Sequence, residues 1–229
     1  MRVLLIADIH GNYRALEAVL DKFGDADEVW CLGDIVACGP MSPECIELVR
    51  RTCKHVVRGN HDKAESVPGE DRVDLDYLES LPASLTVEAD GRSYLLTHNL
   101  PGHAGYVYLR QGRAPFEEAA RNLRADGLLF GHSHTAFILP VGEKMIVNVG
   151  TVGQPRDGDP RAQCMLLEDG RFRFERVEYD LAALEADFRR TRIWQGENLE
   201  KWIRWTVSGI VELHGLQLGP FSRPARHIE

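Results

Sequence analysis

Expected strands and helices alternate through the first sixty residues, and this order restricts the fold more than any other feature of the chain. The apolar runs RVLLIA, EVWCL and HVVR predict buried strands at residues 2–7, 28–32 and 55–58. Apolar residues recur at helical spacing in the two segments between them, 13–23 and 42–51. A β-α-β-α-β order implies parallel strands with helices packed on them. We therefore expect an α/β protein.

The second half of the chain is expected to be richer in strands. Residues 84–98 predict a hairpin whose Asp90-Gly91 pair supplies a primed two-residue turn. Helices are expected at residues 74–81 and 115–125, on either side of this hairpin in the sequence. Further strands, separated by turns, are predicted near residues 127–130, 135–139, 144–149, 162–168 and 171–178.

Helices are expected again from about residue 180 onward. The segments 181–190 and 197–213 both have helical periodicity. The second segment carries one apolar stripe, which consists of Leu199, Trp202, Ile203, Thr206 and Ile210. Such a stripe is typical of a helix face that packs on its own domain. Trp205 lies off the stripe, which makes it the better candidate for an exposed contact.

The composition is that of a single globular domain. With 229 residues, 44% of them hydrophobic and 27% charged, the chain can bury a full core. A net charge of −8 disfavours nucleic acid and anionic membranes as general partners. No run reaches the roughly 18 apolar residues of a membrane span, and the first apolar run ends at Asp8, too early for a signal peptide. Five cysteines without a CxxC pair indicate reduced thiols. We expect one cytoplasmic domain over residues 1–229, with the C-terminal helices packed on it.

Polar side chains that can bind metals follow each of the first three expected strands. Asp8 and His10 follow the first strand, Asp34 follows the second, and Asn60 and His61 follow the third. Taken singly, each has a structural explanation, such as a helix cap or turn. Ligands of open α/β sheets gather outside the carboxyl ends of the strands, so these side chains are expected to meet at one edge.

Three more histidines follow strands of the second half. His98 comes after the second hairpin strand. His132 and His134 follow the apolar run of the segment LLFGHSHTAF, and an extended backbone would place both imidazoles on one face. Two histidines in a turn would be the simpler interpretation, but ligand-capable side chains at five apolar strand ends indicate a shared metal site.

Together these motifs resemble the calcineurin-like metallophosphoesterase superfamily. The motif set is DxH (residues 8–10), GDxxxxG (33–39), GNHD (59–62), the lone His98 and GHxH (131–134). The later segment NVGTVGQPRDGDPRA (148–162) is similar to one found in the compact prokaryotic phosphodiesterase branch. The resemblance implies a four-layer αββα sandwich of two mixed β-sheets flanked by helices.

The resemblance also implies a site for two divalent metal ions. One ion would be held by Asp8, His10, Asp34 and His134. The other would be held by Asp34, Asn60, His98 and His132, so that Asp34 bridges the pair. Imidazole nitrogens with carboxylate and amide oxygens suit Mn²⁺, Fe²⁺, Ni²⁺ or Zn²⁺, and these residues do not select among them.

The implied reaction is in-line attack on phosphorus by a hydroxide that bridges the two metals. Two divalent ions, two ligand carboxylates and one hydroxide carry a single positive charge, which matches a singly charged phosphodiester. His61 would stabilise the pentacoordinate phosphorus or protonate the leaving oxygen, with Asp62 as its orienting partner. A histidine in an ordinary turn is the alternative role for His61.

Departures from the family pattern bear on the substrate. Ser/Thr protein phosphatases of the superfamily carry Asp-Arg in the second motif, whereas this chain has GDIVACGP, and the missing arginine favours diesters over monoesters. Compact relatives often have tyrosine where Cys38 stands and glycine where Asn99 stands, so the pocket shape stays open. Arg156 could replace the missing cation if its loop folds over the metal edge, or it could pair at the surface with Asp157 and Asp159.

The sequence therefore predicts a metal-dependent phosphohydrolase, with a phosphodiesterase favoured. A phosphomonoesterase like the Ser/Thr protein phosphatases and a diadenosine-polyphosphate hydrolase are the enzymatic alternatives. A noncatalytic scaffold like the retromer subunit of this fold is the alternative from another class, and the complete set of seven ligands plus His61 speaks against it. The expected partner is a small-molecule or nucleotide phosphate ester, and self-association stays open.

Overall fold

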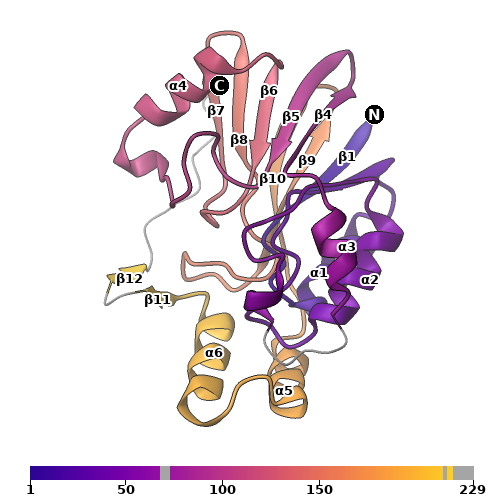
Figure 1. Cartoon of the computed structure of the whole chain (residues 1–229), viewed down its shortest axis with the longest axis vertical. Helices are drawn as coiled ribbons and strands as arrows, with labels where there is room; N and C mark the ends of the chain where they lie inside the picture. Colours follow the sequence, from indigo (N-terminus) through magenta and orange to yellow (C-terminus); the bar gives the residue numbers. More distant parts are fainter. Residues whose placement is uncertain (68–72, 214–215, 219–229) are drawn as a thin grey trace.

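The computed structural model describes residues 1–67, 73–213 and 216–218. Two mixed five-stranded sheets lie against each other, and helices cover their outer faces (Figure 1). This arrangement is the expected four-layer αββα sandwich. None of the helices in the described ranges is both long enough and apolar enough to cross a membrane.

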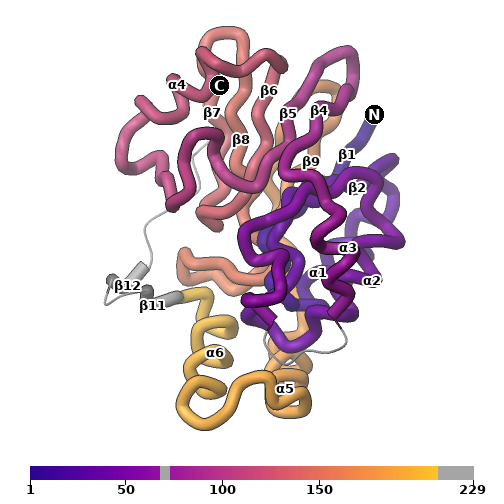
Figure 2. The backbone as a smooth tube through the Cα atoms, in the orientation of Figure 1, coloured from indigo at the N-terminus to yellow at the C-terminus, as the bar shows by residue number. Residues whose placement is uncertain are grey.

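The first sheet has the strand order β10-β9-β1-β2-β3. Its parallel strands are β1 (Arg2–Ile6), β2 (Glu28–Cys31) and β3 (His55–Val56), the last shorter than expected. β9 (Ala162–Glu168) pairs antiparallel with β1, and β10 (Arg171–Val177) pairs antiparallel with β9. The tube view shows β9 beside β1 although they are far apart in the sequence (Figure 2). The helices of this half are α1 (Tyr13–Lys22), α2 (Ser42–Thr52) and α3 (Leu75–Ser80), with a 3-10 turn at Ala64–Ser66.

The second sheet has the strand order β4-β5-β6-β8-β7. Its strands are β4 (Ser84–Ala89), β5 (Arg92–Thr97), β6 (Gly127–Phe130), β7 (Phe137–Val141) and β8 (Lys144–Asn148). The hairpin of β4 and β5 is confirmed, since Asp90 and Gly91 have φ angles of 51° and 73°, as a primed turn requires. A 3-10 turn (Leu109–Gln111) and α4 (Ala114–Asn122) lie between β5 and β6.

Successive side chains of β1 point to opposite faces of the first sheet and pack into two different hydrophobic clusters. Leu4 and Ile6 pack into the hydrophobic cluster beneath α1 and α2, whereas Val3 and Leu5 pack between the two sheets. A third cluster around Phe116 lies between α4 and the second sheet. These three clusters lie one at each interface between the four layers, and a fourth, with Leu184, Phe188 and Ile203, lies in the C-terminal part of the chain.

The C-terminal helices are α5 (Leu181–Thr191) and α6 (Gly196–Ser208), followed by the short pair β11 (Val211–Leu213) and β12 (Leu216–Leu218). The expected helix over 197–213 was too long, because Gly209 has a left-handed φ of 65° and ends α6. The expected exposure of Trp205 was also wrong. Its side chain is only 6% exposed and packs edge-on against Trp202, with ring centroids 5.3 Å apart.

Candidate metal centre

The polar residues after the strands of the first sheet lie at the carboxyl ends of these strands. Asp8 and His10 follow β1, Asp34 follows β2, and Asn60 follows β3. Backbone hydrogen bonds align the first two loops: the Asp8 amide donates to Gly33 O at 2.9 Å, and the His10 amide donates to Asp34 O at 3.0 Å. Parallel pairing of these strands thus gives these side chains a common edge.

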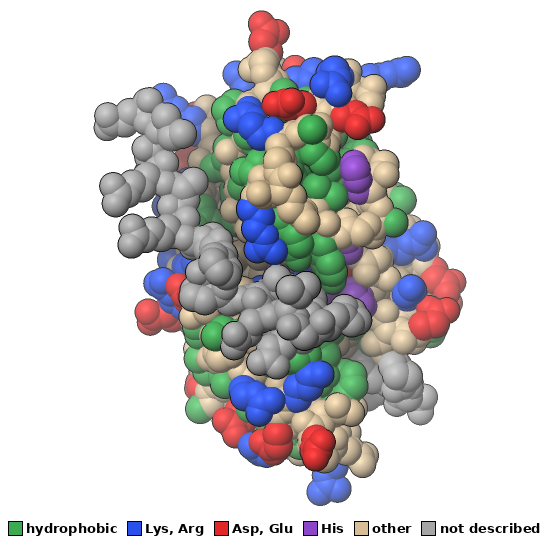
Figure 3. Space-filling view, turned by 90° about the vertical axis from the view of Figure 1, so that its left-hand side faces the viewer, with side chains coloured by type: hydrophobic (Ala, Val, Ile, Leu, Met, Phe, Trp, Pro, Cys, Tyr) green, Lys and Arg blue, Asp and Glu red, His purple; other side chains and the backbone are tan. Residues whose placement is uncertain are grey.

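The second sheet brings its histidines to the same edge. His98 follows β5, and His132 and His134 follow β6, which is parallel to β5. The backbone amide of His132 donates a hydrogen bond of 2.8 Å to the carboxylate of Asp8, which connects the two sheets. Figure 3 shows histidine side chains at the surface to the right of the centre of the face in view, whereas His98, His132 and His134 are themselves buried. The site is therefore shared between the two sheets.

Most of these residues have left-handed backbones. The φ angles of Asp8, His10, Asp34, His132 and His134 lie between 51° and 66°. For side chains other than glycine such angles are uncommon and cost free energy, and they cluster at functional sites. The extended backbone expected for His132 and His134 was therefore wrong. Both imidazoles nevertheless reach the same site, because the backbone of the loop is left-handed at His132 and again at His134.

The buried side chains form two groups that could each hold a metal ion. The first group is Asp8, His10 and His134, and the second is Asp34, His98 and His132. In the first group, His134 Nε2 lies 3.2 Å from Asp8 Oδ1 and 3.1 Å from His10 Nε2. In the second group, His98 Nε2 lies 3.1 Å from Asp34 Oδ2.

Contacts between the groups make them one site. His10 Nε2 of the first group lies 3.8 Å from Asp34 Oδ2 of the second, and His98 Nε2 lies 3.9 Å from Asp8 Oδ1. Asn60 joins the second group, since its Oδ1 atom lies 3.1 Å from His98 Nε2. All seven residues expected as metal ligands are therefore brought together.

The free lone pairs at this site fit metal ions. The Nδ1 atoms of His98 and His134 donate to backbone carbonyls, those of Leu32 and Gln154, each at 2.7 Å, so their Nε2 atoms face the site. Asp8 Oδ1 and His132 Nε2 are buried without a hydrogen-bond partner among the described residues. Buried acceptors left without partners are costly, and cations bound between them would satisfy them.

Burial keeps three of the histidines neutral. It lowers the pKa of His10 to about 3 and that of His132 to about 4, and it holds the pKa of His134 well below its usual value. A neutral imidazole is the form that binds a metal, so protons do not compete at these positions near neutral pH.

Asp34 and His98 form an ion pair within the second group. Burial opposes the charge on both, but the Asp34 carboxylate outweighs it and raises the pKa of His98 to about 10. In turn His98 holds the pKa of Asp34 well below its usual range, against the effect of burial. A metal ion bound here would take the place of the proton on His98.

His61 lies beside the two groups, and Asp62 serves a different purpose from the one expected. The ring of His61 stands edge-on to His10 with centroids 5.4 Å apart, and its Nδ1 atom lies 3.4 Å from Ser66 Oγ. The Asp62 carboxylate does not orient this ring. It accepts hydrogen bonds from backbone amides, including those of Asp34 at 2.9 Å and Gly59 at 2.8 Å, and so holds the loop after β2.

The loop that carries Arg156 folds over the metal edge. Arg156 Nη2 lies 3.3 Å from His134 Nε2 and donates to Gln154 Oε1 at 3.0 Å. The alternative of surface pairing fails, because Asp157 pairs with Arg176 and Asp159 pairs with Arg161. The guanidinium is therefore positioned beside the site.

The comparisons with known proteins agree with this geometry. Residues 1–170 match the family model of the calcineurin-like phosphoesterase superfamily domain. The chain belongs to this superfamily. It is a metal-dependent phosphoester hydrolase, and the scaffold alternative is set aside.

Three similar proteins illustrate the range of this phosphoesterase family. A metallophosphoesterase from Sphaerobacter thermophilus is 31% identical, with a TM-score of 0.75 over 91% of this chain and 100% of that one. An uncharacterized protein of Methanocaldococcus jannaschii is 31% identical over 86% of this chain and 96% of its own length. The phosphodiesterase YfcE of Escherichia coli is 28% identical over 74% of this chain and 89% of its own length.

Two features of this phosphoesterase site have no signal in the sequence. The Tyr106 ring stacks on His132 with centroids 4.6 Å apart, although it lies in an irregular loop. Trp194, between α5 and α6, donates its indole N–H to Cys38 O at 2.8 Å. Neither contact follows from periodicity or a motif, because both depend on how distant loops meet.

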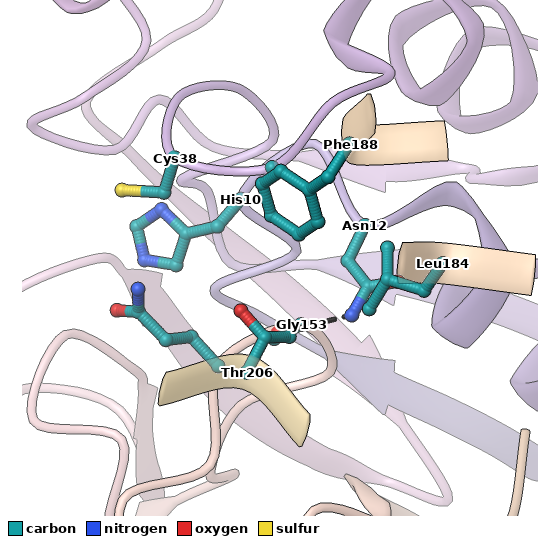
Figure 4. A pocket seen from close by; sticks show the side chains of 9 residues that line it. His10, Asn12, Cys38, Gly153, Leu184, Phe188 and Thr206 are labelled. Atoms are coloured by element: carbon teal, nitrogen blue, oxygen red, sulfur yellow. Dashed lines mark hydrogen bonds between the residues drawn. The ribbon is translucent and has the colours of Figure 1, made fainter. Parts of the chain in front are cut away.

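A small cavity connects the phosphoesterase site to the C-terminal helices (Figure 4). Its labelled lining residues are His10, Asn12, Cys38, Gly153, Leu184, Phe188 and Thr206. Burial raises the pKa of the Cys38 thiol to about 12, so this side chain is neutral.

Asn99 turns toward its own loop, where its amide donates to Ala104 O at 3.4 Å.

Proposed function

We propose that this phosphoesterase is a phosphodiesterase with a dinuclear metal centre. One ion would be bound by Asp8, His10, Asp34 and His134. The other would be bound by Asp34, Asn60, His98 and His132. The observation that carries the proposal is the convergence of these side chains from two sheets, with the Nε2 atoms of His10 and His98 both within 3.8 Å of Asp34 Oδ2.

The bound ions would neutralise negative charge on the phosphate and lower the pKa of a water molecule, so that a nucleophile is available near neutral pH. The donor set of imidazole nitrogens with carboxylate and amide oxygens suits Mn²⁺, Fe²⁺, Ni²⁺ or Zn²⁺. The backbone carbonyls at the Nδ1 atoms of His98 and His134 fix the orientation of both rings.

His61 is the proposed general acid. Its backbone amide donates to Asp34 Oδ1 at 2.7 Å, which ties its position to the proposed bridging ligand. Because the Nδ1 atom faces Ser66, the Nε2 atom is the one that would face the substrate and protonate its leaving oxygen. The ring is partly exposed, so it can exchange its proton with solvent.

Preference for diesters rests on the cations near the site. A phosphomonoester dianion benefits from a bidentate arginine, which the GDIVACGP segment lacks. Arg156 supplies one guanidinium from another loop, at 3.3 Å from His134 Nε2, and would bind a nonbridging phosphate oxygen. The similarity to a protein named as a phosphodiesterase supports the same preference.

The proposal is tested by comparing two chromogenic substrates. Protein loaded separately with Mn²⁺, Fe²⁺, Ni²⁺ or Zn²⁺ is assayed on bis(4-nitrophenyl) phosphate and on 4-nitrophenyl phosphate. We expect kcat/KM to be at least about tenfold higher for the diester, on the scale of one charge-assisted hydrogen bond. A higher value for the monoester with every metal would contradict the proposal.

A further inference from the structure

Tyr106 is an exposed aromatic side chain at the edge of the candidate metal centre. Its exposed fraction is 40%, and the other exposed large hydrophobic side chains of the described residues are Met1 and Ile138. Its ring stacks on the imidazole of His132 at 4.6 Å between centroids, with an interplanar angle of 19°. One face of an aromatic ring is thus fixed beside a proposed metal ligand.

Core packing does not account for the position of Tyr106. Its neighbour Val107, and Leu109 two residues further on, pack against the hydrophobic cluster beneath α4 and anchor the loop. Tyr106 and Tyr108 alternate with them, and their rings stack on each other with centroids 6.1 Å apart. The loop therefore presents two tyrosines away from the core.

Two guanidinium groups complete this surface. Arg156 lies 5.2 Å from the centroid of the Tyr106 ring, and Arg110 lies 4.4 Å from that of Tyr108. Arg156 also contacts His134, so one cation connects the aromatic ring to the proposed metal ligands. A ligand that fits this arrangement has a planar aromatic group joined to an anionic group.

We propose that Tyr106 is a stacking platform for the nucleobase of a nucleoside phosphodiester. This inference rests on the proposed phosphodiesterase function and specifies its substrate class. The phosphate would lie at the metal edge with Arg156, and the base would stack beside it on Tyr106, with Tyr108 continuing the surface. Base stacking on aromatic side chains tolerates any base, so the platform selects nucleosides as a class.

Two cyclic diesters with the same reacting group test the platform. Adenosine 2′,3′-cyclic phosphate carries a base, and glycerol 1,2-cyclic phosphate does not. We expect the wild-type ratio of kcat/KM for the two substrates to favour the adenosine compound, and Tyr106→Leu to lower this ratio by about tenfold. Tyr106→Phe should retain the ratio because it keeps the ring. Ile138→Ala, at the exposed site on β7, is the matched control.

A binding measurement separates this inference from the proposed function. We expect Tyr106→Leu to weaken the binding of adenosine 5′-monophosphate relative to inorganic phosphate by about tenfold in calorimetry. Suppose that the wild type hydrolyses neither diester, but that Tyr106→Leu still weakens the binding of adenosine 5′-monophosphate relative to inorganic phosphate. The phosphodiesterase proposal then fails and the platform proposal holds. If Tyr106→Leu leaves both the kinetic ratio and the relative binding unchanged, the platform is wrong even if both diesters are hydrolysed.

Discussion

At the scale of single residues, a substitution of His61 tests whether its proposed catalytic role is separate from metal binding. His61 lies next to the proposed ligand Asn60 but belongs to neither group of buried ligands. We expect His61→Ala to retain the metal content of the wild type and to lower kcat for a diester by about 10²-fold, the usual scale for a general acid. Metal analysis and kinetics on the same preparation check this. Parallel loss of metal and activity would make His61 a ligand.

Arg156 tests how the substrate is held. We expect Arg156→Gln to lower kcat/KM for a diester by about tenfold at constant metal content, because one charge-assisted hydrogen bond to the phosphate is lost. Arg161→Gln is the matched control, since Arg161 lies in the same segment but pairs with Asp159 at the surface. Equal kinetics of the Arg156 variant and this control would return Arg156 to a structural role.

The identities of the clustered residues were predictable from the sequence, but their local conformations were not. Asp8, Asp34 and His98 stand at strand ends, where the fold brings ligands together. The left-handed backbone at His132 was missed because it depends on the packing of its loop against Asp8. The role of Asp62 was missed because it accepts hydrogen bonds from backbone amides of the loop after β2, and no sequence motif indicates such backbone contacts.

At the scale of elements, one ion pair joins α5 to α1. Asp187 is 4% exposed, and it accepts hydrogen bonds from Arg14 Nε at 2.7 Å and Arg190 Nη2 at 3.0 Å. Burial opposes the charge on Asp187, but these arginines outweigh it and lower the pKa of the carboxyl below its ordinary value of 3.8. Arg14 is one-third exposed, so solvent weakens the pair.

We expect Asp187→Asn to lower the free energy of unfolding by about 1 kcal/mol at pH 7. A carboxyl whose pKa is lower in the folded state contributes stability above about pH 4, and this contribution is lost as the pH falls through the folded-state value. The difference in the free energy of unfolding between wild type and Asp187→Asn, measured by denaturant titration, should therefore shrink as the pH falls toward 2.

Glu185→Gln is the control for this prediction, because Glu185 pairs with Arg189 only at the exposed surface of α5. It should change the unfolding free energy little at either pH. A difference between Asp187→Asn and wild type that stays constant from pH 7 to pH 2 would show that the charge of Asp187 does not stabilise the docking of α5.

Elements were predictable where local chemistry decides them. The Asp90-Gly91 turn fixes the β4 and β5 hairpin, because both residues accept positive φ angles. The end of α6 was missed, because the apolar pattern continues beyond Gly209 while the backbone there turns left-handed. Burial of Trp205 depends on its contact with Trp202 and not on its place in the helical pattern.

At the scale of the whole molecule, the candidate site depends on the packing of one sheet against the other. The first sheet supplies Asp8, His10, Asp34 and Asn60, whereas the second supplies His98, His132 and His134. Neither sheet alone has the full set of proposed ligands for two ions. The hydrophobic cluster between the sheets, with Leu5 and Leu129 among its members, therefore holds the two parts of the site together.

Metal stoichiometry of the wild type and of Asp34→Ala tests this account most directly. Asp34 is the residue assigned to both ions, so the wild type should bind two divalent ions per chain and hydrolyse a diester, and Asp34→Ala should lose both properties. Asp21→Ala, on the exposed side of α1, is the control and should keep both. An Asp34→Ala protein that retains two tightly bound ions and hydrolyses the diester at the wild-type rate would contradict the account.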